Sequence, residues 1–208
     1  MTIIYIPLFF SFRATTPGIL AQLNAVNTKG TFVVDPASLL DGSTALYARQ
    51  LMKAGHFIIP LVGASNGSSI DMALNASSYL FDSYYGGHPS VLMLSGGPWS
   101  LSDCQVVQAL KYQFALRNLD LTNSTIQGKA MGQTTFQAIQ GIFQSALQFQ
   151  PTFANHSLIA TINGYDMNQT SSLSLILAYA ASLNFTSVSY KSCLGLTASF
   201  PAGKHETD

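Results

Sequence analysis

Short apolar runs alternate with helical patterns along almost the whole chain, and this alternation restricts the fold more than any other feature. The predicted strands are residues 3–12, 30–35, 56–62, 90–95, 117–122, 157–162 and 186–190. The segments between them have apolar residues at intervals of three and four, typical of helices that lie on a sheet. These predicted helices are 16–26, 43–55, 68–85, 102–118, 134–149 and 170–184. The pattern predicts a parallel sheet covered by helices.

Seven predicted strands favour a (β/α) barrel over an open sheet, although the pattern alone does not establish closure. A chain of 208 residues is long enough for one substantial core. No linker, repeat or low-complexity tract divides it. We therefore expect a single domain over residues 1–200 and a flexible tail over 201–208.

Charged side chains make up only 9% of the chain, and the nine basic residues balance the nine acidic ones. Binding of nucleic acid needs clustered lysine and arginine, so that class of partner is excluded. The opening apolar run, 3–12, is too short to span a bilayer and has no basic start. We therefore expect a mature, secreted chain from which a leader has been removed, and no transmembrane segment.

Glycosylation acceptor sequences are more frequent than the composition predicts by chance. They are Asn66, Asn75, Asn123, Asn155, Asn168 and Asn184. Attached glycans would supply the hydrophilicity that the charges do not, which predicts a glycoprotein. The alternative is that a chain rich in serine and threonine forms such sequences by accident. Three of the asparagines follow predicted strand ends and are expected on the C-terminal face of a barrel: Asn66, Asn123 and Asn168.

The two cysteines, Cys104 and Cys193, lie far apart and match no zinc or redox spacing. In a secreted chain they would pair with each other, whereas in the cytosol they would be two buried thiols. The acceptor sequences favour the disulfide.

Catalytic groups of a parallel barrel belong at the C-terminal ends of its strands. Those ends carry no histidine pair, no Cys/His couple and no adjacent carboxylates. His56 begins a strand instead of ending one, so we predict a structural role for it. Three aromatic residues could form a platform on which sugars stack, or could simply pack a loop: Tyr84, Tyr85 and Trp99.

Five stretches resemble motifs of the polysaccharide deacetylases, the chitin deacetylase-like family with the NodB homology domain. They are TPGILAQLNAVNTKGTFVVDPASL, KAGHFIIPLVGAS, SGGPWSLSDCQVVQALKYQF, LRNLDLTN and the stretch from SLIATINGYD to KSCLG. The resemblance covers nearly the whole chain. It implies a distorted (β/α) barrel, in agreement with the strand and helix pattern.

Active members of that family bind a divalent metal, usually zinc, through one aspartate and two histidines. A second aspartate acts as base and a histidine of the last motif as acid. The resemblance places other residues at these positions and at the third motif: Arg13, Leu61, Ser65, Ser95, Gly96, Gly97 and Ile162. Asp120, a supporting residue of the fourth motif, is retained. We therefore expect no bound zinc, no other cofactor and no catalytic residues.

These observations favour a secreted, non-catalytic deacetylase-like protein at a cell wall or surface. Its expected partners are chitin, another wall polysaccharide or a wall protein. One alternative is a divergent, active carbohydrate deacetylase that removes N-acetyl groups with substitute metal ligands. The other is a purely structural surface glycoprotein.

Overall fold

The computed structural model of the protein describes residues 4–11, 16–63, 69–95, 99–115, 119–149, 160–162 and 166–195. The expected tail over 201–208 lies outside these residues. Contacts between residues group the chain into two compact units. The first consists of Met1–Phe32 with Arg117–Gly195, and the second contains Val33–Leu116. One strand, β2 (Thr31–Val34), spans the point in the sequence where the units divide.

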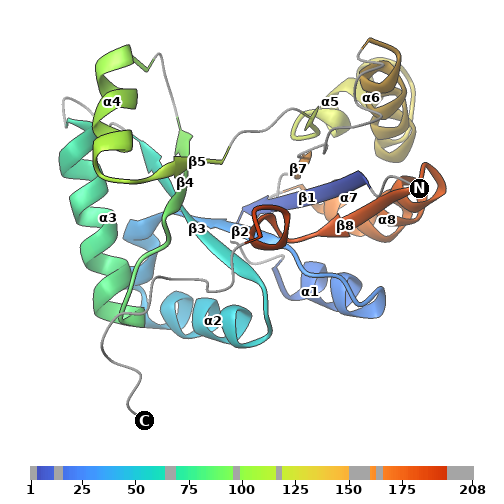
Figure 1. The fold of residues 1–208 in the computed structure, drawn as a ribbon. Helices are drawn as coiled ribbons and strands as arrows, with labels where there is room; N and C mark the ends of the chain where they lie inside the picture. The colour runs from blue at the N-terminus through green and yellow to red at the C-terminus, as the bar shows by residue number, and fades with distance from the viewer. Residues whose placement is uncertain are drawn as a thin grey trace. The chain divides into compact units, whose positions relative to one another are not determined.

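The first unit is built around β1 (Ile4–Ser11), which pairs in parallel with β7 (Ala160–Ile162) and with β8 (Phe185–Val188) (Figure 1). Strand β6 (Leu119–Asp120) extends this sheet by pairing in parallel with β7. The helices of the unit are α1 (Thr16–Ala25), α5 (Ser124–Ala130), α6 (Thr135–Phe149), α7 (Met167–Ser171), α8 (Leu173–Ser182) and α9 (Tyr190–Cys193). All described pairings are parallel, as the sequence predicts.

Aromatic contacts hold α6 and α8 to the strands of the first unit. Phe143 of α6 is fully buried, and its ring lies edge-on to those of Tyr179 and Phe185 at centroid distances of 6.0 and 6.4 Å. Gln22 of α1 adds a polar link: its Nε2 donates to the Thr170 carbonyl at 2.7 Å, and its Oε1 accepts from the Ser174 amide at 2.9 Å. These contacts join α6 to α8 and β8, and α1 to α7 and α8.

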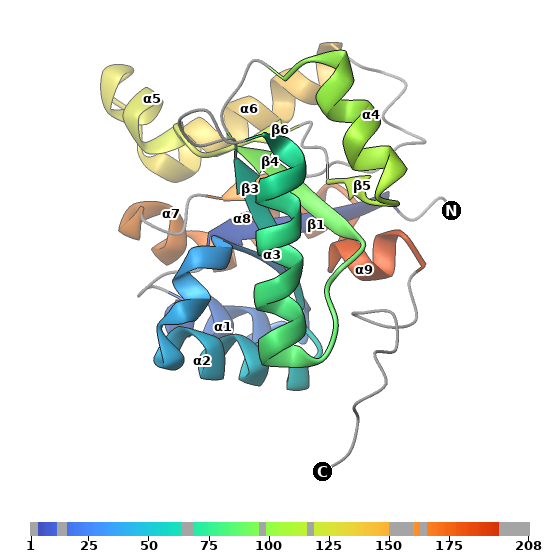
Figure 2. The ribbon, with the colours of Figure 1, turned by 90° about the vertical axis from the view of Figure 1, so that its left-hand side faces the viewer.

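The second unit contains the parallel strands β3 (Phe57–Gly63), β4 (Val91–Ser95) and β5 (Gln113–Phe114). Its helices are η1 (Pro36–Leu40), α2 (Gly42–Lys53), α3 (Ile70–Tyr85) and α4 (Leu101–Ala109). Figure 2 shows α3 lying along β3 and β4. Ser100 and Asp103 form a capping box at the start of α4.

The predicted helix over 102–118 is wrong in its second half. Helix α4 ends at Ala109, and Lys111 takes a left-handed conformation with φ of 63°. The chain then forms β5, which pairs with β4 through Val91–Gln113 and Leu92–Phe114. The described residues therefore contain eight strands, one more than predicted, and α5 and α9 were not predicted. Among the described residues, no helix has both the length and the apolar character needed to cross a bilayer.

Candidate functional site

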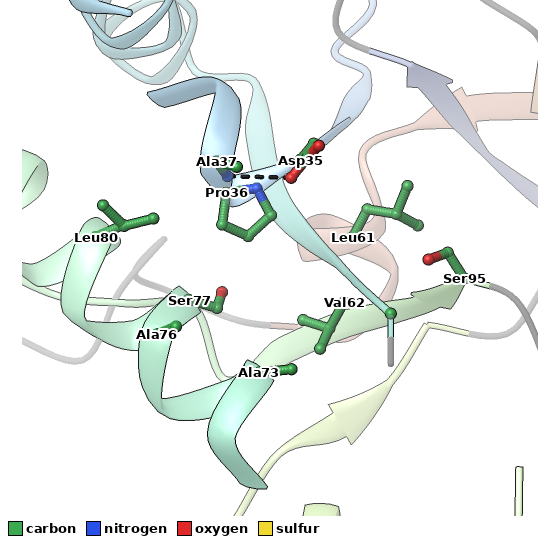
Figure 3. A pocket seen from close by; sticks show the side chains of 11 residues that line it. Asp35, Pro36, Ala37, Leu61, Val62, Ala73, Ala76, Ser77, Leu80 and Ser95 are labelled. Carbon is green, nitrogen blue, oxygen red and sulfur yellow. Dashed lines mark hydrogen bonds between the residues drawn. The ribbon is translucent and has the colours of Figure 1, made fainter. Parts of the chain in front are cut away.

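A cavity of about 500 Å³ opens in the second unit beside the C-terminal ends of β3 and β4 (Figure 3). This edge of a parallel sheet is where ligand sites are normally built. Its lining comes from the chain after β2, the ends of β3 and β4, and one face of α3: Asp35, Pro36, Ala37, Leu61, Val62, Gly63, Ala73, Ala76, Ser77, Leu80 and Ser95. The described part of the wall is mostly hydrocarbon, with one carboxylate and two hydroxyls.

Asp35 is held at the cavity by its capping role. It directly follows β2 and precedes Pro36, whose fixed φ suits the first position of η1. Its Oδ1 accepts a hydrogen bond from the Ala37 amide at 3.0 Å (Figure 3). Its Oδ2 has no hydrogen-bond partner among the described residues, so one carboxylate oxygen remains available to a ligand.

The Ser95 hydroxyl fits at the edge of the cavity because the residue beside it on the neighbouring strand is a glycine. Gly63 and Ser95 are paired in the β3–β4 register. A Cβ atom on residue 63 would lie 2.4 Å from Ser95 Oγ, which is too close. The glycine therefore leaves room for the hydroxyl at the edge of the cavity. Ser77 of α3, only 4% exposed, supplies the other hydroxyl.

The three aromatic residues for which the sequence left open a sugar platform or loop packing do not form one platform. Tyr84 and Tyr85 end α3, with ring centroids 6.2 Å apart, and line a depression of about 200 Å³ together with Arg49. Trp99 packs instead against the cluster that contains Ile70 and Leu74, near the start of α3. Stacking of a sugar on the two tyrosines stays a prediction.

Tyr85 is the most perturbed tyrosine of this depression. Its hydroxyl donates to the Ala45 carbonyl at 3.1 Å. Burial of the ring raises the pKa of Tyr85 to about 12, against the lowering influence of the Arg49 charge. The phenol is therefore neutral over the whole physiological range, where it acts as a hydrogen-bond donor.

The structure describes only some of the cysteines and acceptor asparagines, so it can check these predictions only in part. Cys104 of α4 forms no disulfide with a described side chain, and the side chain of Cys193 lies outside the described residues, so their pairing stays a prediction. Asn66 and Asn155 also lie outside the described residues. The four acceptor asparagines that are described are all exposed: Asn75, Asn123, Asn168 and Asn184.

Two acceptor asparagines lie where the sequence predicts them, beyond the C-terminal ends of neighbouring parallel strands. Asn123 follows β6, and Asn168 follows β7. The fully buried Gln169 ties the two loops together, because its Nε2 donates to the Thr122 carbonyl at 2.9 Å. Both asparagines therefore belong to one edge of the first unit.

No protein-family model and no curated protein matches the sequence of this chain. The folds of solved structures do match. The chitin deacetylase from the fungal pathogen Colletotrichum lindemuthianum superposes with a TM-score of 0.76 over 99% of this chain and 96% of that chain, at 16% identity. This chain has the polysaccharide deacetylase fold. The comparison confirms the predicted α/β class, and the parallel strands are consistent with a distorted barrel.

Two bacterial structures with the deacetylase fold extend the comparison. The peptidoglycan deacetylase PdaC from Bacillus subtilis is 14% identical, with a TM-score of 0.68 over 93% of this chain and 91% of that chain. A CE4 family pseudoenzyme from Bacillus anthracis is 10% identical, with a TM-score of 0.70 over 92% of this chain and 66% of that chain. The fold is thus found in enzymes and in a pseudoenzyme, and does not itself decide activity.

The positions at which the resemblance implies metal-binding, catalytic or supporting residues lie in both units. Leu61 and Ser95 come together in the cavity of the second unit. In the first unit, Ile162 ends β7 and is fully buried. Asp120 ends β6 and is exposed, where its carboxylate accepts hydrogen bonds from the amide and hydroxyl of Thr122 at 3.0 and 2.6 Å. Four further positions lie outside the described residues: Arg13, Ser65, Gly96 and Gly97.

The described residues at these positions do not fit the zinc of active deacetylases. Zinc needs nitrogen, sulfur or oxygen ligands, usually four, and Leu61, at the position of a metal-binding histidine, offers only hydrocarbon. Ile162 takes the position of the acid histidine and has no proton to donate. Among the described residues, no three His, Cys, Asp or Glu side chains are grouped as a metal site would require. His56 is 1% exposed at the beginning of β3, the end of the strand opposite the cavity, as its predicted structural role requires.

Sequence reasoning missed Asp35 and Ser77 as residues of the site. The signal for Asp35 was present, since an aspartate followed by proline directly after an apolar run marks a strand end with a cap. Ser77 gave no such signal, because it becomes part of the cavity only when α3 packs against β3.

Proposed function

We propose that this chain is a non-catalytic protein of the deacetylase fold that binds a polysaccharide in the cavity of the second unit. The observation that carries the proposal is Leu61. At this position the resemblance implies a metal-binding histidine, whereas the leucine here forms part of the apolar wall of a cavity of about 500 Å³. The position is thus adapted to contact a ligand and not to hold an ion.

The cavity has the chemistry of a sugar site. A pyranose ring presents an apolar C–H face and a rim of hydroxyls. Leu61, Val62 and Leu80 offer a hydrocarbon surface, while Asp35 and Ser95 offer groups that bind hydroxyls. A carboxylate oxygen makes a stronger hydrogen bond to a hydroxyl than a neutral acceptor does. The cavity volume also lies within the usual range for small-molecule sites.

The names of the structural neighbours suggest which sugar to test. They include a chitin deacetylase and a peptidoglycan deacetylase. Both polymers contain N-acetylglucosamine, so oligomers of this sugar are the first candidates. Without a metal to polarise the amide and activate water, hydrolysis would lose contributions of several kcal/mol to transition-state stabilisation. Binding without turnover is therefore the proposed outcome.

The proposed location is extracellular, at a wall or surface. The low charge content and the four exposed acceptor asparagines support it, because attached glycans would make the surface hydrophilic. A Cys104–Cys193 disulfide belongs to the same proposal.

The proposed site is tested by measuring the affinity for N-acetylglucosamine oligomers in calorimetric titrations. Asp35→Asn should weaken binding about tenfold, since loss of a charged hydrogen bond costs about 1.5 kcal/mol or more. Asparagine caps a helix as well as aspartate does, so the variant should fold normally. Asp120→Asn, an exposed aspartate at another strand end, is the matched control and should bind like the natural protein. Equal affinity of all three proteins would exclude the cavity as the site.

A further inference from the structure

A second hollow, of about 560 Å³, lies in the first unit along α5 and α6 and is unrelated to the deacetylase motifs. Figures 1 and 2 show the two helices side by side. Half of its ten described lining residues are glutamines, namely Gln127, Gln133, Gln137, Gln140 and Gln144. We call this hollow the glutamine groove.

The helix repeat aligns the glutamines of α6. Gln137, Gln140 and Gln144 are spaced by three and four residues, so they lie on one face. Ile139 and Phe143 of the same helix are fully buried, so a different face of α6 packs into the core. The glutamine groove is therefore a surface that α6 keeps free of its own packing.

A close contact fixes the other wall of the glutamine groove. A Cβ atom on Gly128 of α5 would lie only 3.0 Å from the Thr134 carbonyl oxygen and 3.1 Å from that of Gln133. Glycine therefore lets α5 pack closely against the turn before α6. Thr134 also donates to Gln137 Oε1 through its amide, at 2.9 Å, which orders the start of α6. The groove is thus defined by tight local packing.

Gly141 leaves the glutamine groove open. It lies inside α6 and lines the groove, and a Cβ atom added there would have no atom within 4 Å. Glycine inside a helix lowers helix stability relative to alanine. No contact in the described structure requires the glycine, so its effect is to keep space above the helix backbone.

The lining of the groove selects a chemical class of ligand. Among the lining residues that the structure describes, there is no lysine, arginine, histidine, aspartate or glutamate. A charged ligand would lose its hydration without gaining a counter-charge, and an apolar ligand would leave the amides without partners. A glutamine amide has two N–H donors and a carbonyl acceptor, which match the hydroxyls of a sugar. Gln137 contributes its N–H donors, because its Oε1 already accepts hydrogen bonds from Thr134. We propose that the glutamine groove binds an uncharged polysaccharide chain.

This inference does not depend on the cavity proposed above, because the groove has different residues in a different unit. The test compares Gly141→Leu with Gly18→Leu. Both glycines are in helices with no atom within 4 Å of an added Cβ atom, but Gly18 is in α1, away from the groove. Leucine is a better helix former than glycine, so we expect both variants to fold.

The probes are soluble oligomers of glucose and of N-acetylglucosamine, with polygalacturonate as a charged comparison. All proteins are compared in the Asp35→Asn background, which weakens the cavity site. The inference predicts that Asp35→Asn with and without Gly18→Leu binds a neutral oligomer equally, and that adding Gly141→Leu weakens the remaining binding at least tenfold. Thermal denaturation should show that Gly141→Leu is at least as stable as the natural protein. A loss seen only in Asp35→Asn would support the cavity and overturn the groove. Preference for polygalacturonate, or no binding of any neutral oligomer, would also overturn it.

Discussion

Replacing Gly63 with alanine should destabilise the protein, although the same change often stabilises a strand. The new methyl carbon would lie 2.4 Å from Ser95 Oγ and 3.3 Å from the Ser95 carbonyl oxygen. Relieving the first contact means moving the hydroxyl or shifting β3 against β4. Overpacking of this kind costs about 1–3 kcal/mol. Removing the hydroxyl should recover most of that cost, because the next contact, 3.3 Å, needs only a small shift.

The assay is a double-mutant cycle measured by urea unfolding of Gly63→Ala, Ser95→Ala and the double variant. We expect Ser95→Ala alone to change the free energy of unfolding by less than about 0.5 kcal/mol. The coupling energy between the two changes should be about 1 kcal/mol or more. Gly42→Ala, where no atom lies within 4 Å of the added Cβ, is the control and should not destabilise. If Gly63→Ala is as stable as the natural protein, the Ser95 hydroxyl turns away at little cost, and the reasoning that it restricts residue 63 to glycine is refuted.

Three further predictions concern the core, the tyrosines and the cysteines. Phe143→Ala should lower the free energy of unfolding by about 3–5 kcal/mol, because it empties a fully buried site, whereas exposed Met131→Ala should change it little. An absorbance titration should show a tyrosine that ionises near pH 12 and is missing in Tyr85→Phe. Since burial raises this pKa, the stability it contributes is complete below about pH 10 and is lost between pH 10 and 12. In protein produced through a secretory pathway, Cys104 and Cys193 should be unreactive until a reductant is added; two thiols titrated in unreduced, denatured protein would exclude the disulfide.

Much of the fold was predictable, because hydrophobic periodicity reports directly which face of an element is buried. The parallel pairing and the order of strands and helices follow from it. The prediction that the helix continues from Ala109 to residue 118 is wrong for a physical reason. The segment keeps a helical pattern, but Lys111 adopts the left-handed conformation, for which a lysine gives no signal.

The candidate sites were less predictable, because they depend on tertiary packing. Leu61 and Ser95 were recognised through family motifs, but the cavity they share with Ser77 needs the docking of α3 on β3. The glutamine groove was missed for a similar reason. Helix α5 has only seven residues, too few for a clear periodic pattern, so the wall that it forms could not be foreseen.

The central claim is that this deacetylase fold binds a sugar chain without hydrolysing it. The most direct measurement is acetate release from N-acetylglucosamine oligomers by the purified, full-length protein, with added zinc and with a known active deacetylase as positive control. We predict that the acetate released equals that of a protein-free blank, with and without zinc. Zinc-dependent acetate release that a chelator abolishes would contradict the account, and would show that residues other than those described here hold a catalytic metal.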